Sequence, residues 1–187
     1  MPKNKVNWGL CNMFYAIITE TDGVVSYGTP KEFGAAVNMT TSPRGETTEF
    51  EANNVVFYRA FSNDGYDVEL ETATIPDEFE NEVLGQVLDA KKVLIESNTD
   101  VIKRVAILGQ FEGDVHKKRF VLYNCLPSRP DMNGSTSRNI KPQTRKLKLV
   151  ADPRADGIVK ASTTAETDAA VYSAWFNDVY EKTVAGG

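Results

Sequence analysis

Residues 63–71 read Asn63-Asp64-Gly65-Tyr66-Asp67-Val68-Glu69-Leu70-Glu71. From Tyr66 onwards apolar side chains alternate with carboxylates, which is the period of a strand with one dry and one wet face. An Asp-Gly pair precedes the alternation, and this pair suits the positive φ angles of a tight hairpin. The stretch therefore predicts a strand that starts at Tyr66, joined by a hairpin turn to the apolar run that ends near Tyr58.

Similar short apolar runs lie on both sides of this stretch, rich in β-branched and aromatic residues. They are residues 14–18, 55–58, 105–108, 120–123, 147–149 and 158–159. Turn sequences separate them, at residues 21–23, 112–114 and 152–157. Short strands divided by regular turns favour an antiparallel β-sandwich or barrel, and no boundary divides residues 1–187 into two domains.

Two segments break the period of two. Residues 75–85 predict a short helix, since Pro76 and acidic residues stand at its start and Gly85 at its end. Its Phe79 and Val83 share one face, and so short a helix must pack on the sheet to be stable. Residues 168–180 predict an amphipathic helix with a wide aromatic stripe, preceded by a polar tether; the two together span residues 161–182.

A third segment, residues 40–51, is rich in Thr and Glu around Pro43-Arg44-Gly45. It predicts an extended hairpin that reaches beyond the sheet.

The composition is that of a globular protein, with 41% hydrophobic and 25% charged residues. Acidic residues outnumber basic ones, 26 to 21, which argues against a protein that grips nucleic acid through a basic patch. The two cysteines, Cys11 and Cys125, have no metal-ligand spacing and make no disulfide framework. We expect no membrane insertion and no export signal, and therefore a protein that stays in the cytoplasm where it is made.

Catalytic patterns are missing from the sequence. The only histidine is His116, beside an expected turn, and no phosphate-binding loop, His-Glu-x-x-His pair or Gly-x-Ser-x-Gly elbow occurs. The carboxylates Asp67, Glu69 and Glu71 are explained by a wet strand face rather than by acid–base chemistry. The residues predict neither an enzyme nor a cofactor.

The order of several short motifs is similar to that of one family. The motifs are Lys3-Asn4-Lys5-Val6-Asn7-Trp8-Gly9-Leu10, Phe14-Tyr15-Ala16, Ser26-Tyr27-Gly28-Thr29-Pro30, Phe57-Tyr58, Asn63-Asp64-Gly65-Tyr66, Ile75-Pro76-Asp77-Glu78-Phe79 with Val83-Leu84-Gly85, Val121-Leu122-Tyr123-Asn124-Cys125, Ser128-Arg129-Pro130, Pro142-Gln143-Thr144, Arg154-x-Asp156-Gly157 and Trp175-Phe176-x-x-Val179-Tyr180. Together they resemble the major tail proteins, or tail tube proteins, of long flexible-tailed phages (siphophages) of Gram-positive bacteria.

The resemblance implies a β-sandwich subunit with a flanking helix, located in the virion tail. It implies homohexameric rings that stack into a tube with a β-barrel inner wall. Double-stranded DNA would pass through that tube without specific binding. The implied partners are further copies of the chain and the tape-measure, tail-terminator and distal tail proteins.

Within that expectation, three sets of residues are candidates for assembly. The extended hairpin is a candidate for inter-ring contacts through Thr41, Pro43, Arg44 and Glu46. The chain ends are expected to join it. Acids that could face the lumen fall into two sets: Glu49 and Glu51, or Asp67, Glu69 and Glu71. The C-terminal helix carries the aromatic residues Trp175, Phe176 and Tyr180. They either form an interface with another copy or pack on the subunit's own sheet.

Two other functions remain open at this point. A virion binding module for a receptor or carbohydrate would expose clustered aromatic residues on loops and would not form tubes. A small β-barrel enzyme would need a pocket with perturbed titratable groups.

Overall fold

The computed structural model describes residues 9–52, 54–134 and 143–183, and within them the fold is mainly β. Two short helices accompany the strands, α1 (Asp77–Glu82) and α2 (Ala169–Ala174). The strands are β1 (Leu10–Thr21), β2 (Val24–Tyr27), β3 (Lys31–Gly34), β4 (Ala36–Pro43), β5 (Thr47–Ala52), β6 (Val55–Phe61), β7 (Tyr66–Thr72), β8 (Val87–Leu88), β9 (Leu94–Ile95), β10 (Val105–Phe111), β11 (Arg119–Pro127), β12 (Arg145–Ala151) and β13 (Lys160–Ser162). The expected antiparallel β-fold with two helical segments is confirmed.

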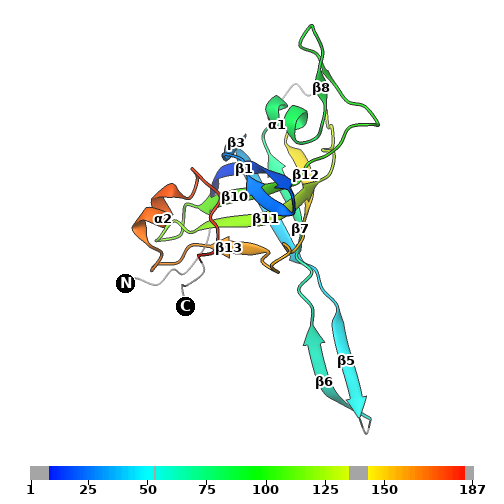
Figure 1. Cartoon of the computed structure of the whole chain (residues 1–187), viewed down its shortest axis with the longest axis vertical. Coiled ribbons are helices and arrows are strands. Elements are labelled where there is room, and N and C mark those ends of the chain that lie inside the picture. Colours follow the sequence, from blue (N-terminus) through cyan, green and yellow to red (C-terminus); the bar gives the residue numbers. More distant parts are fainter. Residues whose placement is uncertain (1–8, 53, 135–142, 184–187) are drawn as a thin grey trace.

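The main sheet is antiparallel and runs in the order β2-β1-β10-β11-β12-β7-β4. β3 pairs with β1 at one end of this order, and β4 pairs with β7 at the other. Only Ala35 separates β3 from β4, so one continuous stretch of chain connects the two ends of the sheet. The sheet therefore curves round a common interior (Figure 1).

That interior is the first of two apolar clusters. The inward residues of β7 and β12, Val68 and Leu70 against Leu147 and Leu149, pack there with side chains from β1, β10 and β11. Helix α1 adds Phe79, whose ring lies edge-on to Tyr15 and Phe33 at centroid distances of 5.0 and 4.7 Å. The short helix is thus held by the core, as its sequence required.

The second cluster lies on the opposite face of β1, β10 and β11. Ala16, Ala106, Leu108, Val121 and Tyr123 point to that side and are covered by the segment that follows α2. Strands buried on both faces have no wet face, which explains why residues 105–110 are all buried instead of alternating. Such runs are stable only if a second layer covers them.

Two sequence-based expectations about connections are wrong. Residues 63–65 do not make a tight hairpin between β6 and β7, because β6 pairs with β5 whereas β7 pairs with β4 and β12. The loop at residues 152–157 does not pair its two flanking strands: β12 and β13 both lie along β11. The last strand is β13, directly after the expected run 158–159.

The C-terminal segment also differs from the expectation. The stretch from residue 161 is no tether, since β13 pairs with β11 and Thr163 is buried with its Oγ1 accepting from the Arg119 N–H at 2.9 Å. The helix is shorter than residues 168–180, because α2 ends at Ala174. Asp168 caps it, accepting hydrogen bonds from the Ala170 and Val171 amides at 2.8 and 3.3 Å.

Candidate functional site

A two-stranded arm leaves the body of the molecule. Strands β5 and β6 pair only with each other, and they project as an extended hairpin well beyond the main sheet (Figure 1). We call residues 47–61 the distal arm. At about 3.3 Å per residue, its strands reach roughly 20 Å from the body. The expected hairpin therefore exists, but it occupies residues 47–61, whereas residues 40–43 belong to β4 in the main sheet.

The distal arm exposes large apolar side chains. Phe57 and Phe61 are 78% and 76% exposed, and Phe50, Val55, Val56 and Tyr58 are also exposed. Phe50 lies opposite Tyr58 on one face, whereas Glu49 lies opposite Arg59 on the other and forms an ion pair at 2.8 Å. An isolated hairpin of two strands is marginally stable in water, and its edges are open to further pairing. β6 thus has the apolar composition of a buried strand, but nothing in the described residues covers it.

The base of the arm is tightly defined. Where β4 passes into β5 and β6 returns to β7, backbone hydrogen bonds of 2.9–3.0 Å join Arg44 to Gly65 and Asp64, and Glu46 to Ser62. A Cβ atom on Gly45 would lie 2.1 Å from the Ser62 carbonyl oxygen, and one on Gly65 would lie 1.9 Å from the Ala151 carbonyl oxygen. Any side chain is therefore excluded at both positions. The two strands of the arm leave the body side by side.

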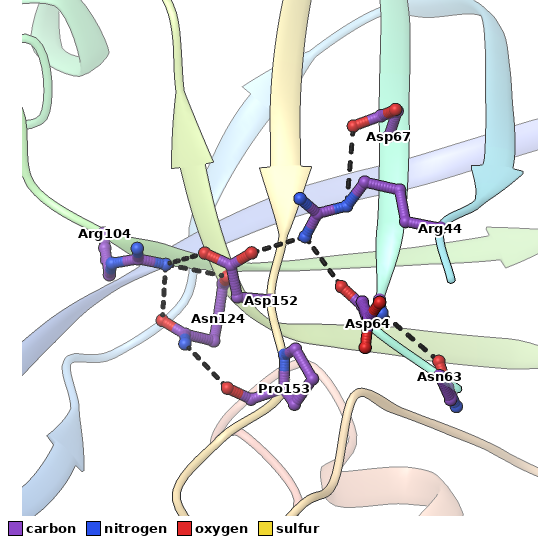
Figure 2. Close-up of polar contacts among 9 residues, drawn as sticks. Arg44, Asn63, Asp64, Asp67, Arg104, Asn124, Asp152 and Pro153 are labelled. Atoms are coloured by element: carbon purple, nitrogen blue, oxygen red, sulfur yellow. Dashed lines mark hydrogen bonds and ion pairs between the residues drawn. The ribbon is translucent and has the colours of Figure 1, made fainter. Parts of the chain in front are cut away.

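A cluster of charged side chains links this base to the body (Figure 2). The Arg44 guanidinium donates to the Asp152 carboxylate and, at 2.7 Å, to the Asp64 carbonyl. The second carboxylate oxygen of Asp152 accepts from Arg104 at 2.8 Å, and Arg104 also donates to the Asn124 side chain at 3.2 Å. Asp152 therefore connects the arm, through Arg44, to strand β11 and the start of β10.

The charge of Asp152 depends on these arginines. Its partial burial raises the pKa, but hydrogen bonds from Arg104 and Arg44 outweigh that effect and hold the pKa below its ordinary value. The folded state thus favours the carboxylate form. The resulting stabilisation is complete above the ordinary aspartate pKa of about 3.9, and it is lost as the pH falls through the lower folded value.

We expect Asp152→Asn to lower the free energy of unfolding by about 1–2 kcal/mol at neutral pH, since charge-assisted hydrogen bonds to two arginines are weakened. Chemical denaturation measures this, with Asp131→Asn, a substitution at an exposed aspartate, as the control. The difference from the unsubstituted protein should shrink as the pH falls from about 4 through the lower folded pKa of Asp152, because below that value both proteins carry an uncharged group. Equal stability at neutral pH would show that the cluster holds nothing in place.

The structure places the expected inter-ring residues at the base of the arm rather than along it. Thr41 and Pro43 are exposed on β4, Glu46 is exposed just before β5, and Arg44 is half-buried in the charged cluster. Their role in inter-ring contacts stays a prediction. The chain ends expected to join them lie largely outside the described residues.

The two sets of candidate lumen acids lie apart. Glu49 and Glu51 are on β5 of the distal arm. Asp67, Glu69 and Glu71 line the outer face of β7, where basic side chains accompany them: Lys146 donates to Glu69 at 2.6 Å and Arg44 lies 3.6 Å from Asp67. The β7 face is therefore of mixed charge, and which set faces a lumen stays a prediction.

The aromatic residues after α2 pack on their own sheet. Trp175 is 3% exposed, stacks on Tyr180 at a centroid distance of 5.5 Å, and belongs to the second apolar cluster. Phe176 and Tyr180 are half-buried beside it, with Phe176 stacked on Phe14 at 4.9 Å. Within one subunit Trp175 therefore packs on its own sheet, which favours that alternative, and an interface role of the three aromatic residues stays a prediction.

Reactive groups are dispersed in the described residues. Within them no group of His, Cys, Asp and Glu side chains could hold a metal ion. Cys11 and Cys125 are free thiols opposite the two ends of β10. No helix in the described ranges is long and apolar enough to cross a membrane.

The sequence matches no protein-family model and no curated protein sequence. Among solved structures it is similar to a chain in the cryo-EM structure of the anti-feeding prophage tube-terminating cap, with a TM-score of 0.49 and 10% identity over 86% of this chain and 95% of that one. It is also similar to a chain in the extended sheath–tube complex of the PVC extracellular contractile injection system, with a TM-score of 0.46 and 10% identity over 82% and 89%. Likenesses this distant identify neither a family nor a function.

Proposed function

We propose that this chain is a structural subunit that assembles with copies of itself into a tail tube. The observation that carries the proposal is the distal arm, a strand pair whose large apolar side chains are exposed and whose edges are unpaired. Monomeric soluble proteins rarely expose a continuous apolar patch of this kind unless a partner covers it. A second copy is the partner that the resemblance to tail tube proteins supports.

The finer features of the proposal follow the resemblance. We propose homohexameric rings, stacked so that double-stranded DNA passes through the tube without specific binding. An excess of carboxylates suits this role, because attractive contacts with phosphates would hold the DNA back. The tape-measure, tail-terminator and distal tail proteins are the proposed partners, and the virion tail is the proposed location.

Electron microscopy of the concentrated, purified protein tests the proposal directly. We expect negative-stain images to show rings and stacked tubes, and we expect the fraction of protein that pellets to rise with its concentration, because association is driven by mass action. A protein that stays monomeric at high concentration and is missing from virions would contradict the proposal. Binding of a receptor or carbohydrate by such a monomer would instead support a virion binding module.

A further inference from the structure

A second projection lies at the end of the molecule opposite to the distal arm (Figure 1). Strands β8 and β9 pair only with each other, Val87 with Ile95 and Leu88 with Leu94. We call residues 87–95 the finger. It follows helix α1 directly and returns towards β10.

The finger has a defined conformation. The Asp89 carboxylate accepts hydrogen bonds from the Lys91 and Val93 amides at 2.8 and 2.9 Å, which closes the tip. At its base Gly85 has a φ of +85°, and a Cβ there would lie 2.9 Å from the backbone of Val101. The finger is therefore held at its tip and base by short-range contacts, as expected of a surface that exists before a partner arrives.

This ordered projection nevertheless exposes apolar side chains. Val87 is 61% exposed, and Leu88, Val93 and Ile95 are also exposed. The finger and the distal arm thus both expose large apolar side chains, at opposite ends of one molecule.

Their charges are of opposite sign. The arm and the residue before it carry three carboxylates, those of Glu46, Glu49 and Glu51. Their one basic residue is Arg59, which is already paired with Glu49. In the finger, Lys91 and Lys92 outnumber Asp89, whose carboxylate is occupied by backbone amides. The residue after the finger, Glu96, is neutralised by an ion pair with Arg129 at 2.8 Å. Neither lysine forms an ion pair within the described parts of the chain. An acidic, apolar projection and a basic, apolar one are complementary.

We propose that the finger is the docking surface for the distal arm of another copy of this chain. The inference rests on the proposed self-assembly and names the surface that receives the arm. Because the two surfaces differ and lie at opposite ends, each bound copy presents a free arm or finger to the next. Such a heterologous contact extends a stack without limit.

Charge reversal tests the pairing. Lys91→Glu/Lys92→Glu makes both projections acidic, and Glu46→Lys/Glu51→Lys makes both basic while leaving the Glu49–Arg59 pair in place. We expect each variant alone to lose at least tenfold in sedimentable assembly, because like charges then meet at every contact. A mixture of the two should recover assembly, since the arm of each variant is complementary to the finger of the other.

The control is Lys117→Glu/Lys182→Glu, which lowers the net charge by the same amount as Lys91→Glu/Lys92→Glu, at exposed positions outside both projections. The inference is overturned if both variants pellet like the unsubstituted protein, if the mixture stays soluble, or if the control is equally defective. The unsubstituted protein, measured in the same run, reports on self-assembly itself. Its failure to pellet would remove the proposed function and this inference together, whereas its normal assembly beside unaffected variants would remove this inference alone.

Discussion

Replacing the distal arm by an Asn-Gly turn between Glu46 and Ser62 should give a folded, soluble subunit that cannot polymerise. The two flanking residues already face each other, with the Ser62 N–H donating to the Glu46 carbonyl at 3.0 Å. A two-residue turn of this type therefore closes the chain without disturbing β4 or β7. The arm contributes no side chain to either apolar cluster, so its loss should change the melting temperature by only a few degrees.

Thermal unfolding by circular dichroism and sedimentation of the concentrated protein measure the two effects separately. Deleting residues 41–48 instead is a poor test, because that change removes residues 41–43, three of the eight residues of β4, from the main sheet and should unfold the subunit. Normal tubes formed by the shortened protein would show that the arm takes no part in assembly. Unfolding of that protein would show that the arm supports its own body, contrary to the contacts in the structure.

The alternation around Val68 and Leu70 predicted the fold class correctly because the physical rule behind it is local. These residues face the core in β7, and Asp67, Glu69 and Glu71 face outwards. The helix at α1 was predictable for a similar reason, since its apolar pair, Phe79 and Val83, is fully buried. The spacing of apolar residues is enough to predict a strand or helix where one face of that element is exposed to water.

The same rule failed where the partner of a strand is not in its own sequence neighbourhood. Residues 55–58 read as a core strand, yet β6 lies in the exposed arm. Apolar character predicts burial, but it does not say whether the burial occurs within the chain or against another copy. Asn63-Asp64-Gly65 read as a tight turn for a related reason: it lies at the base of a longer hairpin, where backbone hydrogen bonds link the pairing of β4 with β7 to that of β5 with β6.

The charged cluster at the base of the arm was beyond sequence reasoning altogether. Arg44, Arg104 and Asp152 are separated by dozens of residues and meet only because β4, β10 and β12 converge. The finger was missed because its apolar residues surround an unremarkable Asp-Ala-Lys-Lys turn. Its significance depends on exposure, which is a property of the fold.

The C-terminal aromatic segment allows the sharpest separation of stability from assembly. Trp175→Ala should lower the free energy of unfolding by about 3–5 kcal/mol, because it removes a buried ring from the second apolar cluster and leaves a cavity. For a chain of this length that loss corresponds to a fall in melting temperature of about 6–20 °C. Phe57→Ala is the comparison variant, since it also removes an aromatic ring, but one that is exposed on the arm.

Phe57→Ala should leave the melting temperature within a few degrees and reduce sedimentable assembly instead. The two substitutions thus predict opposite patterns: Trp175→Ala changes unfolding first, and Phe57→Ala changes association at constant stability. Measuring both variants below the melting temperature of the weaker one keeps the comparison clean. If Trp175→Ala abolished assembly without changing the unfolding curve, the indole would have to contact another copy, and its burial within one chain would not be its main role.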